Sequence, residues 1–291
     1  MPLLYFWRGD NYRRDLDYGA GYHLNQANPL LHQIDIGDSL WAFTRTREQQ
    51  YALAAELVVR AKTMNPPKFR YGPYRIWGDL SRSRYFQVDG QPSIEQVVRS
   101  LSIRPQGTPL GRSFQGRAAV GRITAQDHQV LLQVTEDLPL EPRARILPEE
   151  RLEALVLSGD AESVRRLVSE EPAGIIRERA EYLYGPLIRR SWQRVAQLRQ
   201  LYRGQCQICE WCPRAVYGRD LCEAHHIQWL SRGGADALEN MTLVCPNHHR
   251  AIHHCDAAFD FGDLCFDFGG RRERLSVNQH LPLPEPLSEH P

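Results

Sequence analysis

A stretch rich in histidine constrains this chain more than any other feature. Residues 221–254 read LCEAHHIQWLSRGGADALENMTLVCPNHHRAIHH and hold six histidines and two cysteines. Two further cysteines, Cys206 and Cys209, precede the stretch with the spacing C-x-x-C. Imidazole and thiolate groups are the ligands that zinc and related metals prefer. The stretch therefore predicts a metal-binding fold around which the neighbouring chain must pack.

The order of elements in this stretch is strand, loop, strand, helix. Apolar runs at 221–227 and 241–244 predict two strands, and Ser-Arg-Gly-Gly at 231–234 predicts a loop between them. Pro246 suits the first position of a helix, where its missing N–H costs nothing. In that helix His249 and His253 lie on the same face, although two surface histidines are the alternative reading of this spacing. Neighbouring side chains of a strand point to opposite faces, so His225 and His226 should have different roles.

These residues, in this order, resemble the HNH endonuclease family, whose ββα-metal fold is shared with colicin-type nucleases and many homing and restriction endonucleases. The resemblance implies that His226 is the general base that activates a water molecule. It implies that Asn240 orients the loop and His226, or in some members joins the metal. It also implies that the catalytic metal is held by His225, His249 and His253.

The chemistry of phosphodiester hydrolysis agrees with these roles. A neutral histidine with a pKa near ~6.5 suits a general base at physiological pH. A divalent ion can act as a Lewis acid on the scissile phosphate. Because a three-histidine site accepts several ions, Mg²⁺, Mn²⁺, Ni²⁺ and Zn²⁺ are all candidates. We expect His226 to need an acceptor at its other ring nitrogen, supplied by Asn240 or a backbone carbonyl.

A second metal is expected beside the first. Members of this family often carry two C-x-x-C pairs that hold a structural zinc, and the corresponding residues here are Cys206, Cys209, Cys245 and His248. Zinc accepts a Cys3His set as readily as four cysteines. Cys212 is a rival ligand, because Cys209 and Cys212 also form C-x-x-C. We expect Cys222, Cys255 and Cys265 to be buried thiols.

The cysteines also indicate the compartment. All seven lie between Cys206 and Cys265, and an odd number in a metal-ligand pattern favours a reducing environment over disulfides. The start, MPLLYFWRGD, lacks the features of a signal peptide, and no stretch approaches a membrane span. We therefore expect a cytoplasmic protein, and because lysine occurs only at Lys62 and Lys68 among many arginines, we expect a bacterial one.

Basic residues gather in two stretches, at 60–84 and at 186–219. They predict contacts with DNA phosphates. The net charge is only +1, so the distribution matters more than the total. Arginines on solvated surfaces are the alternative. The candidates for DNA binding are Arg70, Arg75, Arg82, Arg84, Arg189, Arg190 and Arg194.

We expect an α+β protein with a β-rich domain at 1–140, a helical connector at 141–203, the HNH domain at 204–270 and a disordered tail at 271–291. Strands are predicted at 3–7, 36–43, 120–124 and 130–132, and a helix at 49–61. Helices are predicted at 149–170, with a break at 158–160, and at 173–202, with an interruption at 185–186. A hairpin is predicted at 259–268.

The N-terminal region resembles the PUA-like superfamily, which includes EVE, ASCH and SRA modules. The residues that carry this resemblance are Gly37, Asp38, Leu40 and Trp41, in an aromatic-rich β context. It implies that a flipped, modified base stacks between aromatic rings. The candidates are Trp7, Trp41, Tyr71, Tyr74 and Trp77, and the alternative is that these rings fill the core.

The sequence thus predicts a metal-dependent DNA endonuclease of restriction or defence, dependent on base modification. A homodimer would allow both strands to be cut. One alternative is a non-catalytic, zinc-stabilised module that binds nucleic acid. Another is a nuclease effector gated by a ligand or partner that the N-terminal domain senses.

Overall fold

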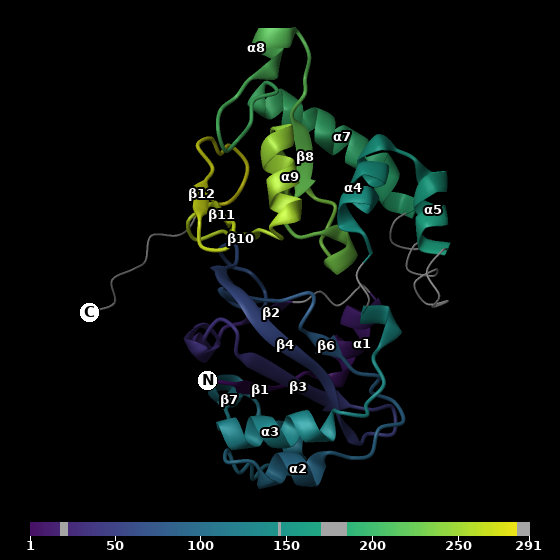
Figure 1. Ribbon diagram of the computed structural model, residues 1–291, viewed down its shortest axis with the longest axis vertical. Helices are drawn as coiled ribbons and strands as arrows, with labels where there is room; N and C mark the ends of the chain where they lie inside the picture. The colour runs from purple at the N-terminus through teal and green to yellow at the C-terminus, as the bar shows by residue number, and fades with distance from the viewer. Residues whose placement is uncertain (18–22, 145–146, 170–184, 284–291) are drawn as a thin grey trace, which may run out of the picture. The chain divides into compact units, whose positions relative to one another are not determined.

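The computed structural model describes residues 1–17, 23–144, 147–169 and 185–283. The chain forms two compact units. One consists of Met1–Lys62 with Phe69–Arg145, and the other of Thr63–Lys68 with Ile146–Pro291. The architecture is mixed α+β, with a β-rich N-terminal unit (Figure 1). Within the described residues, no helix is both long enough and apolar enough to span a membrane.

A single curled sheet organises the first unit. Its strands follow the order β2-β5-β4-β3-β1-β7, and β6 also pairs with β4. β1 runs parallel to β3, whereas β7 pairs with β1 in the antiparallel sense. The strands are β1 (Leu3–Phe6), β2 (His23–Gln26), β3 (Ser39–Arg45), β4 (Tyr51–Met64), β5 (Tyr74–Gly78), β6 (Arg84–Tyr85) and β7 (Val120–Arg122).

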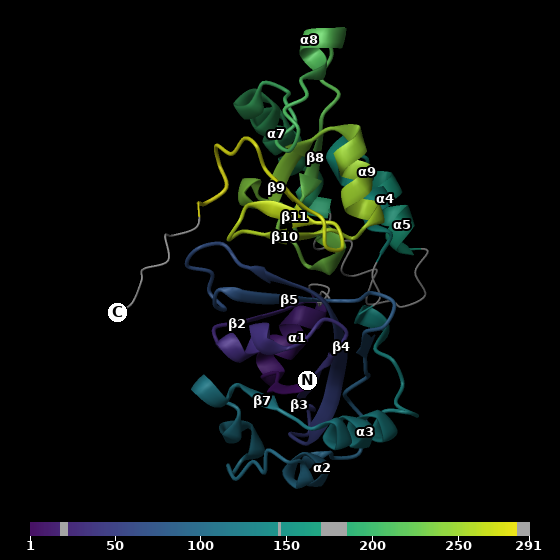
Figure 2. The ribbon, with the colours of Figure 1, turned by 60° about the vertical axis from the view of Figure 1, so that its left-hand side comes forward.

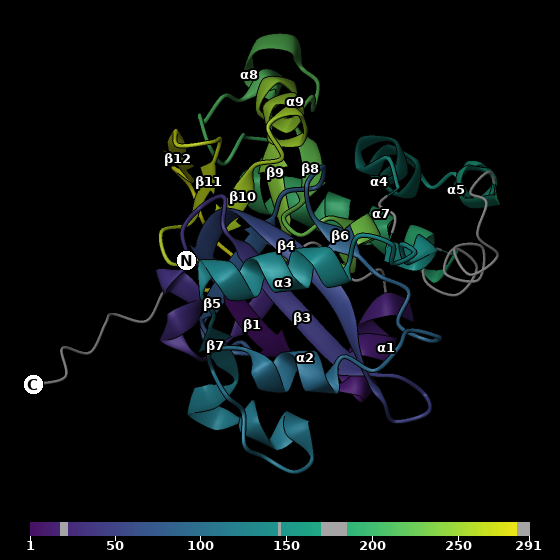
Figure 3. The ribbon, with the colours of Figure 1, turned by 60° about the horizontal axis from the view of Figure 1, so that its bottom comes forward.

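Both faces of this sheet are buried, because alternating side chains enter two separate cores. Leu3 and Leu40 pack with residues of α1 (Gly9–Asp17) and η1 (Pro29–Gln33). Leu4 and Trp41 pack on the opposite side with residues of α2 (Glu95–Ser100) and α3 (Ala125–Val134). Figure 3 shows α2 and α3 in front of β1 and β3. Short 3₁₀ turns complete the unit at η2 (Leu110–Ser113), η3 (Gly116–Ala118) and η4 (Pro142–Ala144).

The predicted helix at 49–61 is wrong, because this segment lies in the long central strand β4 (Tyr51–Met64). Alanine, leucine and glutamate gave the segment a helical character in the sequence. Residues 51–59 are all buried, so the strand is apolar on both faces and shows no alternation. Sheet pairing on both sides overrides a weak intrinsic preference of this kind.

The predicted strand at 130–132 is also wrong, because it lies in α3 (Ala125–Val134). A start signal for this helix is present in the sequence. The side chain of Thr124 accepts from the backbone N–H of Asp127, and Asp127 accepts from the N–H of Thr124. This reciprocal capping box marks a helix N-terminus and outweighs the β-prone run inside the helix.

Other predicted elements are confirmed. The strands expected at 3–7, 36–43 and 120–124 correspond to β1, β3 and β7. The first predicted helix is split into α4 (Glu149–Ser158) and α5 (Ala161–Ser169), and Gly159 at φ 82° ends α4. The second corresponds to α7 (Gly185–Tyr202), while its predicted part at 173–184 lies outside the described residues.

The second unit contains the histidine-rich stretch as two strands and a helix. β8 (Glu223–His226) pairs antiparallel with β9 (Met241–Val244), and α9 (Pro246–His254) follows β9 directly. Two 3₁₀ turns, η6 (Leu230–Arg232) and η7 (Leu238–Asn240), lie between the strands. Figure 2 shows α9 beside this pair.

A small sheet of three strands completes the second unit. The predicted hairpin at 259–268 is confirmed as β10 (Ala258–Asp260) and β11 (Cys265–Asp267). β12 (Arg272–Arg274) pairs with β11, within the stretch that was predicted to be a tail. α8 (Pro213–Tyr217) lies in the loop after the first cysteines. Residues 284–291 lie outside the described range.

Candidate metal centres

The loop between β8 and β9 is held in shape by Asn240. Its Oδ1 accepts from the backbone N–H of Gln228, and its Nδ2 donates to the carbonyls of Gln228 and Ala235. Gly234 allows a close approach of the chain here, since a Cβ on it would lie 1.9 Å from the Gln228 carbonyl oxygen. These hydrogen bonds of Asn240 go to the backbone and not to His226, and they fix the end of β8 relative to the loop.

Three of the four predicted histidines converge on one point. His225 leaves β8 toward α9, where His249 and His253 are one turn apart on the same face. The ring centroids of His249 and His253 are 4.8 Å apart, as are those of His225 and His253. The Nε2 atoms of His249 and His253 are 3.2 Å apart. The ββα arrangement thus brings together three candidate ligands from two elements.

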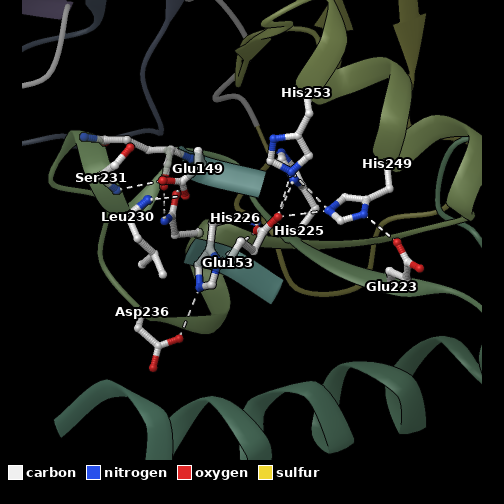
Figure 4. Close-up of polar contacts among 12 residues, drawn as sticks. Glu149, Glu153, Glu223, His225, His226, Leu230, Ser231, Asp236, His249 and His253 are labelled. Atoms are coloured by element: carbon white, nitrogen blue, oxygen red, sulfur yellow. Dashed lines mark hydrogen bonds and ion pairs between the residues drawn. The ribbon is translucent and has the colours of Figure 1, made fainter. Parts of the chain in front are cut away.

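A glutamate that the sequence analysis did not single out lies at the centre of this group. Glu153 enters from α4, and its side chain is only 1% exposed (Figure 4). Three imidazole nitrogens surround its Oε2: His253 Nε2 at 2.8 Å, His249 Nε2 at 2.9 Å and His225 Nδ1 at 3.3 Å. Ligands about 2.0–2.2 Å from one ion lie roughly 2.8–3.6 Å from each other. The four side chains therefore fit a divalent metal ion.

His226 lies on the other side of Glu153. Its backbone N–H and its Nδ1 both face Glu153 Oε1, with the ring nitrogen at 3.0 Å. Its Nε2 faces Asp236 Oδ1 at 3.2 Å. We expected Asn240 or a backbone carbonyl to orient this ring. The structure corrects that expectation, because two buried carboxylates take the place of those neutral acceptors.

Burial and the neighbouring charges shift the pKa values of these groups in opposite directions. Burial lowers the pKa of His225 to about 4 and outweighs its attraction to Glu153. Burial would also lower the pKa of His226, but its hydrogen bonds to Asp236 and Glu153 raise it to about 9. Burial opposes ionisation of Glu153, yet the neighbouring histidines hold the pKa of this carboxyl well below its usual range. The carboxylate is therefore charged and needs positive charge around it.

Helix α4 is attached to the β8–β9 loop through a second glutamate. Glu149, one turn before Glu153, accepts from the backbone N–H groups of Leu230 and Ser231 at 2.8 and 2.9 Å. Leu152 and Leu230 also share a small apolar cluster. The sequence carried a signal for the burial of both glutamates, since they fall in the apolar stripe of α4 and not on its polar face.

The four predicted zinc ligands also come together. Cys209 and Cys245 have their sulfurs 4.0 Å apart, and His248 Nδ1 lies 3.2 Å from Cys245 Sγ and 3.6 Å from Cys206 Sγ. Tetrahedral zinc ligands of these types are separated by roughly 3.5–3.8 Å. This Cys3His set therefore fits a zinc ion that would brace the turn of Cys206 and Cys209 against the start of α9.

The second ring nitrogen of His248 faces a carboxylate, and the other four cysteines lie outside the Cys3His set. His248 Nε2 lies 3.2 Å from Glu273 Oε2, which suits a metal-bound imidazole that donates to a carboxylate. Cys212 Sγ faces the carbonyl of Arg203 at 4.0 Å and does not belong to the Cys3His set. Cys222 and Cys265 are buried as expected, whereas Cys255 is exposed, contrary to expectation.

The arginines predicted to bind DNA occupy different surroundings. Arg70 and Arg82 are exposed. Arg75 is buried and donates to Asn25, and burial lowers its pKa to about 10. Arg84 pairs with the buried Glu56 at 2.6 Å. In α7, Arg194 pairs with Asp236, and the side chains of Arg189 and Arg190 lie outside the described residues.

The aromatic candidates for a base pocket are mostly packed in the first unit. Trp7, Trp41 and Trp77 are buried, and Trp41 donates from Nε1 to His128 Nδ1 at 2.9 Å. Tyr74 is half-buried, and Tyr71 is 38% exposed. A ring packed on both faces cannot stack on a base, so Tyr71 and Tyr74 are the more accessible candidates.

Comparisons with known proteins find a family match within the second unit. Residues 206–254 match the family model described as HNH endonuclease. The type IV methyl-directed restriction enzyme EcoKMcrA of Escherichia coli (strain K12) is 29% identical over 102 residues. That match covers 34% of this chain and 34% of the relative, so the chain spans about a third of the length of this curated relative.

A solved structure, the type IV phosphorothioation-dependent restriction endonuclease ScoMcrA, also matches. It is 13% identical, with a TM-score of 0.21, and the match covers 86% of this chain and 50% of that one.

Proposed function

Because residues 206–254 form an HNH endonuclease domain, we propose that this protein is a metal-dependent DNA endonuclease of restriction or defence. One observation carries the proposal. Three histidines and Glu153 place their ligand atoms within 4.8 Å of one another, directly beside His226. Neighbouring imidazoles in contact with one carboxylate suit a divalent cation, and a further histidine at this position suits proton transfer.

The metal would be held by His225, His249, His253 and Glu153, and would supply Lewis-acid stabilisation of charge on the scissile phosphate and the leaving oxygen. His226 acts as the general base. Its Nδ1–H donates to Glu153, and its pKa of about 9 keeps a proton on Nε2 as long as Asp236 faces that nitrogen. Nε2 must lose this proton, with Asp236 turned away, before it can accept one from water. Asn240 holds the loop that places this ring, through three hydrogen bonds to the backbone.

A gated nuclease is the second candidate, and one contact favours it. His226 Nε2, the atom that must accept the proton, faces Asp236, whose other oxygen pairs with Arg194. Asp236 must turn away before Nε2 can reach a water molecule. A ligand, a protein partner or DNA itself could release it, and the first unit is the candidate sensor.

The zinc of the Cys3His set has a structural role in this proposal. It would hold the start of α9 and so fix His249 and His253, which follow on the same helix. Four protein ligands close a tetrahedral zinc site, whereas an ion that takes six ligands, such as Mg²⁺, would keep positions for substrate beside the same number of side chains.

Dependence on base modification is the finer part of the proposal. EcoKMcrA is described as methyl-directed, and this chain resembles it over 102 residues. We propose that the first unit reads a modified base, with Tyr71 and Tyr74 as the accessible aromatic rings and Arg70 and Arg82 as the exposed cations. One centre per chain cuts one strand, so double-strand cleavage would require a homodimer or two successive events.

The test is a nicking assay on supercoiled plasmid with Mg²⁺, Mn²⁺, Ni²⁺ or Zn²⁺, with and without cytosine modification. Cleavage by the wild-type protein that is lost in His226→Ala supports the nuclease, and a preference for modified DNA supports the reader. Binding without nicking under every ion would instead favour a non-catalytic nucleic-acid-binding module. Nicking only after a ligand or partner is added would favour the gated form.

A further inference from the structure

Glu153 lies outside the segment that matches the HNH family, yet it contacts every histidine of the centre. It is 96 residues from His249 and comes from α4, before the first cysteine. We infer that Glu153 is the fourth protein ligand of the catalytic metal and, through its other oxygen, the residue that positions the general base His226. This inference rests on the proposed nuclease function and extends its centre to a helix upstream of the HNH motif.

The burial of Glu153 is the first argument. An ionised carboxylate that is removed from water needs compensating positive charge, because burial of an unpaired charge is costly. In the part of the chain that the structure describes, its recorded contacts are with the imidazole nitrogens of four histidines and one backbone N–H. None of these groups carries a fixed charge, so without a metal ion several histidines crowded around one carboxylate would have to be protonated together.

The orientation of the imidazoles is the second argument. His249 directs Nδ1 at the carboxylate of Glu223, which holds the ring proton on that nitrogen. Its Nε2 then carries a lone pair, but this atom faces Glu153 Oε2 at 2.9 Å. Two lone pairs repel each other at this distance unless a proton or a metal ion lies between them. His253 Nε2 lies 3.2 Å from His249 Nε2 and faces the same oxygen, so one metal ion at this point would satisfy all three atoms at once.

The two oxygens of Glu153 divide between two tasks. Oε2 faces the three histidine ligands, whereas Oε1 lies 3.0 Å from His226 Nδ1. One buried carboxylate thus joins the metal ligands to the general base and favours a proton on Nδ1 of His226. Carboxylates that orient imidazoles beside metals commonly change metal affinity or activity by roughly 10- to 100-fold when removed.

Glu149 provides a matched control on the same helix. Both glutamates are buried, and they are one turn apart. Glu149 accepts from the backbone N–H groups of Leu230 and Ser231. It does not belong to the cluster of Glu153 and three histidines whose ligand atoms converge. A Glu149→Gln change therefore removes a buried carboxyl group from α4 without removing a candidate ligand.

The experiment uses the full chain with zinc already bound at the Cys3His set, and Co²⁺ as the probe of the second site. Affinity is measured by calorimetric titration, and coordination by the visible absorption of bound Co²⁺. We expect Glu153→Gln to raise the Kd for Co²⁺ by at least about tenfold and to change the absorption spectrum. Glu149→Gln should leave both close to those of the wild type, and circular dichroism checks the fold of each variant.

His253→Ala separates the two ways in which this account can fail. Loss of Co²⁺ binding in His253→Ala, with an unchanged Kd and spectrum in Glu153→Gln, would overturn the role of Glu153 and leave the histidine centre in place. Unchanged binding in both variants would overturn the centre itself. If Glu153→Gln does not fold, Glu153→Asp provides the test, because a shorter carboxylate should keep the fold and shift the spectrum.

Discussion

Helix α9 contributes to two ligand sets that differ in almost every respect. Its first turn gives His248 to the Cys3His set, and His249 and His253 go to the set that contains Glu153. The first set takes its ligands from segments close to the HNH motif and can close a tetrahedron with protein atoms alone. The second combines neutral imidazoles with a buried carboxylate and lies beside His226. Neighbouring residues of one helix can thus serve stability and chemistry separately, because successive side chains point in different directions.

The largest effect should come from the Cys3His set. Small zinc domains gain about 10 kcal/mol from metal-coupled folding, which is on the scale of a domain's whole stability. We expect Cys245→Ser to lose zinc and to unfold the second unit, as measured by metal analysis and thermal melting. Cys255→Ser, at an exposed cysteine just after the same helix, is the control and should melt like the wild type. A Cys245→Ser protein that is folded without zinc would contradict the structural role of the Cys3His set.

The second-largest effect should be on the rate of plasmid nicking and not on folding. Removal of the general base in His226→Ala should slow plasmid nicking by roughly 10²- to 10⁴-fold while the zinc content stays the same. His254→Ala, at an exposed histidine at the end of α9, should nick at the wild-type rate. Equal rates in the wild type and His226→Ala would show that another group takes the proton.

A smaller effect is expected at Asn240, which belongs to neither set. Asn240→Ala removes three side-chain hydrogen bonds to the loop, which should cost about 1–3 kcal/mol of stability. We also expect slower nicking, because the end of β8 carries His226. Urea unfolding and nicking rates measure both. The exposed Asn247 offers a control. An Asn240→Ala protein as stable as Asn247→Ala would show that Asn240 does not stabilise the loop.

An effect on stability of about the same size should come from Arg194, and it tests whether this residue positions Asp236 or binds DNA. Its ion pair with the buried Asp236 predicts that Arg194→Gln loses about 1–3 kcal/mol of stability. A direct phosphate contact would instead lower the salt slope of DNA binding by about one. Filter binding at several salt concentrations decides between these roles, with Arg250→Gln, at an exposed arginine of α9, as the control for lost charge.

Much of the second unit could be predicted from sequence because its signals are local. The two strands, the helix from Pro246 and the spacing of cysteines and histidines all lie within 206–254. Residues that contact each other through chain reversals of this length leave a recognisable spacing. The order of these residues along the chain was therefore enough to carry the resemblance to the HNH family, which in turn grouped His225, His249 and His253.

The carboxylates of the centre could not be predicted in the same way. Glu153 and Glu149 reach the loop only because α4 packs against it, and no short-range pattern specifies that contact. Asp236 lies within the segment that matches the HNH family, but its role depends on which way the loop turns. In the first unit, β4 looked helical because both of its faces are buried, so the alternation that identifies a strand was absent.

The most direct measurement of the central claim is the number of divalent ions bound per chain, counted after equilibrium dialysis against Mn²⁺, with nicking followed on the same samples. The wild-type protein should hold one zinc and one Mn²⁺ and should nick plasmid. His253→Ala should keep its zinc, bind no second ion and fail to nick. A His253→Ala protein that still binds Mn²⁺ and nicks like the wild type would contradict the assignment of this cluster as the nuclease centre.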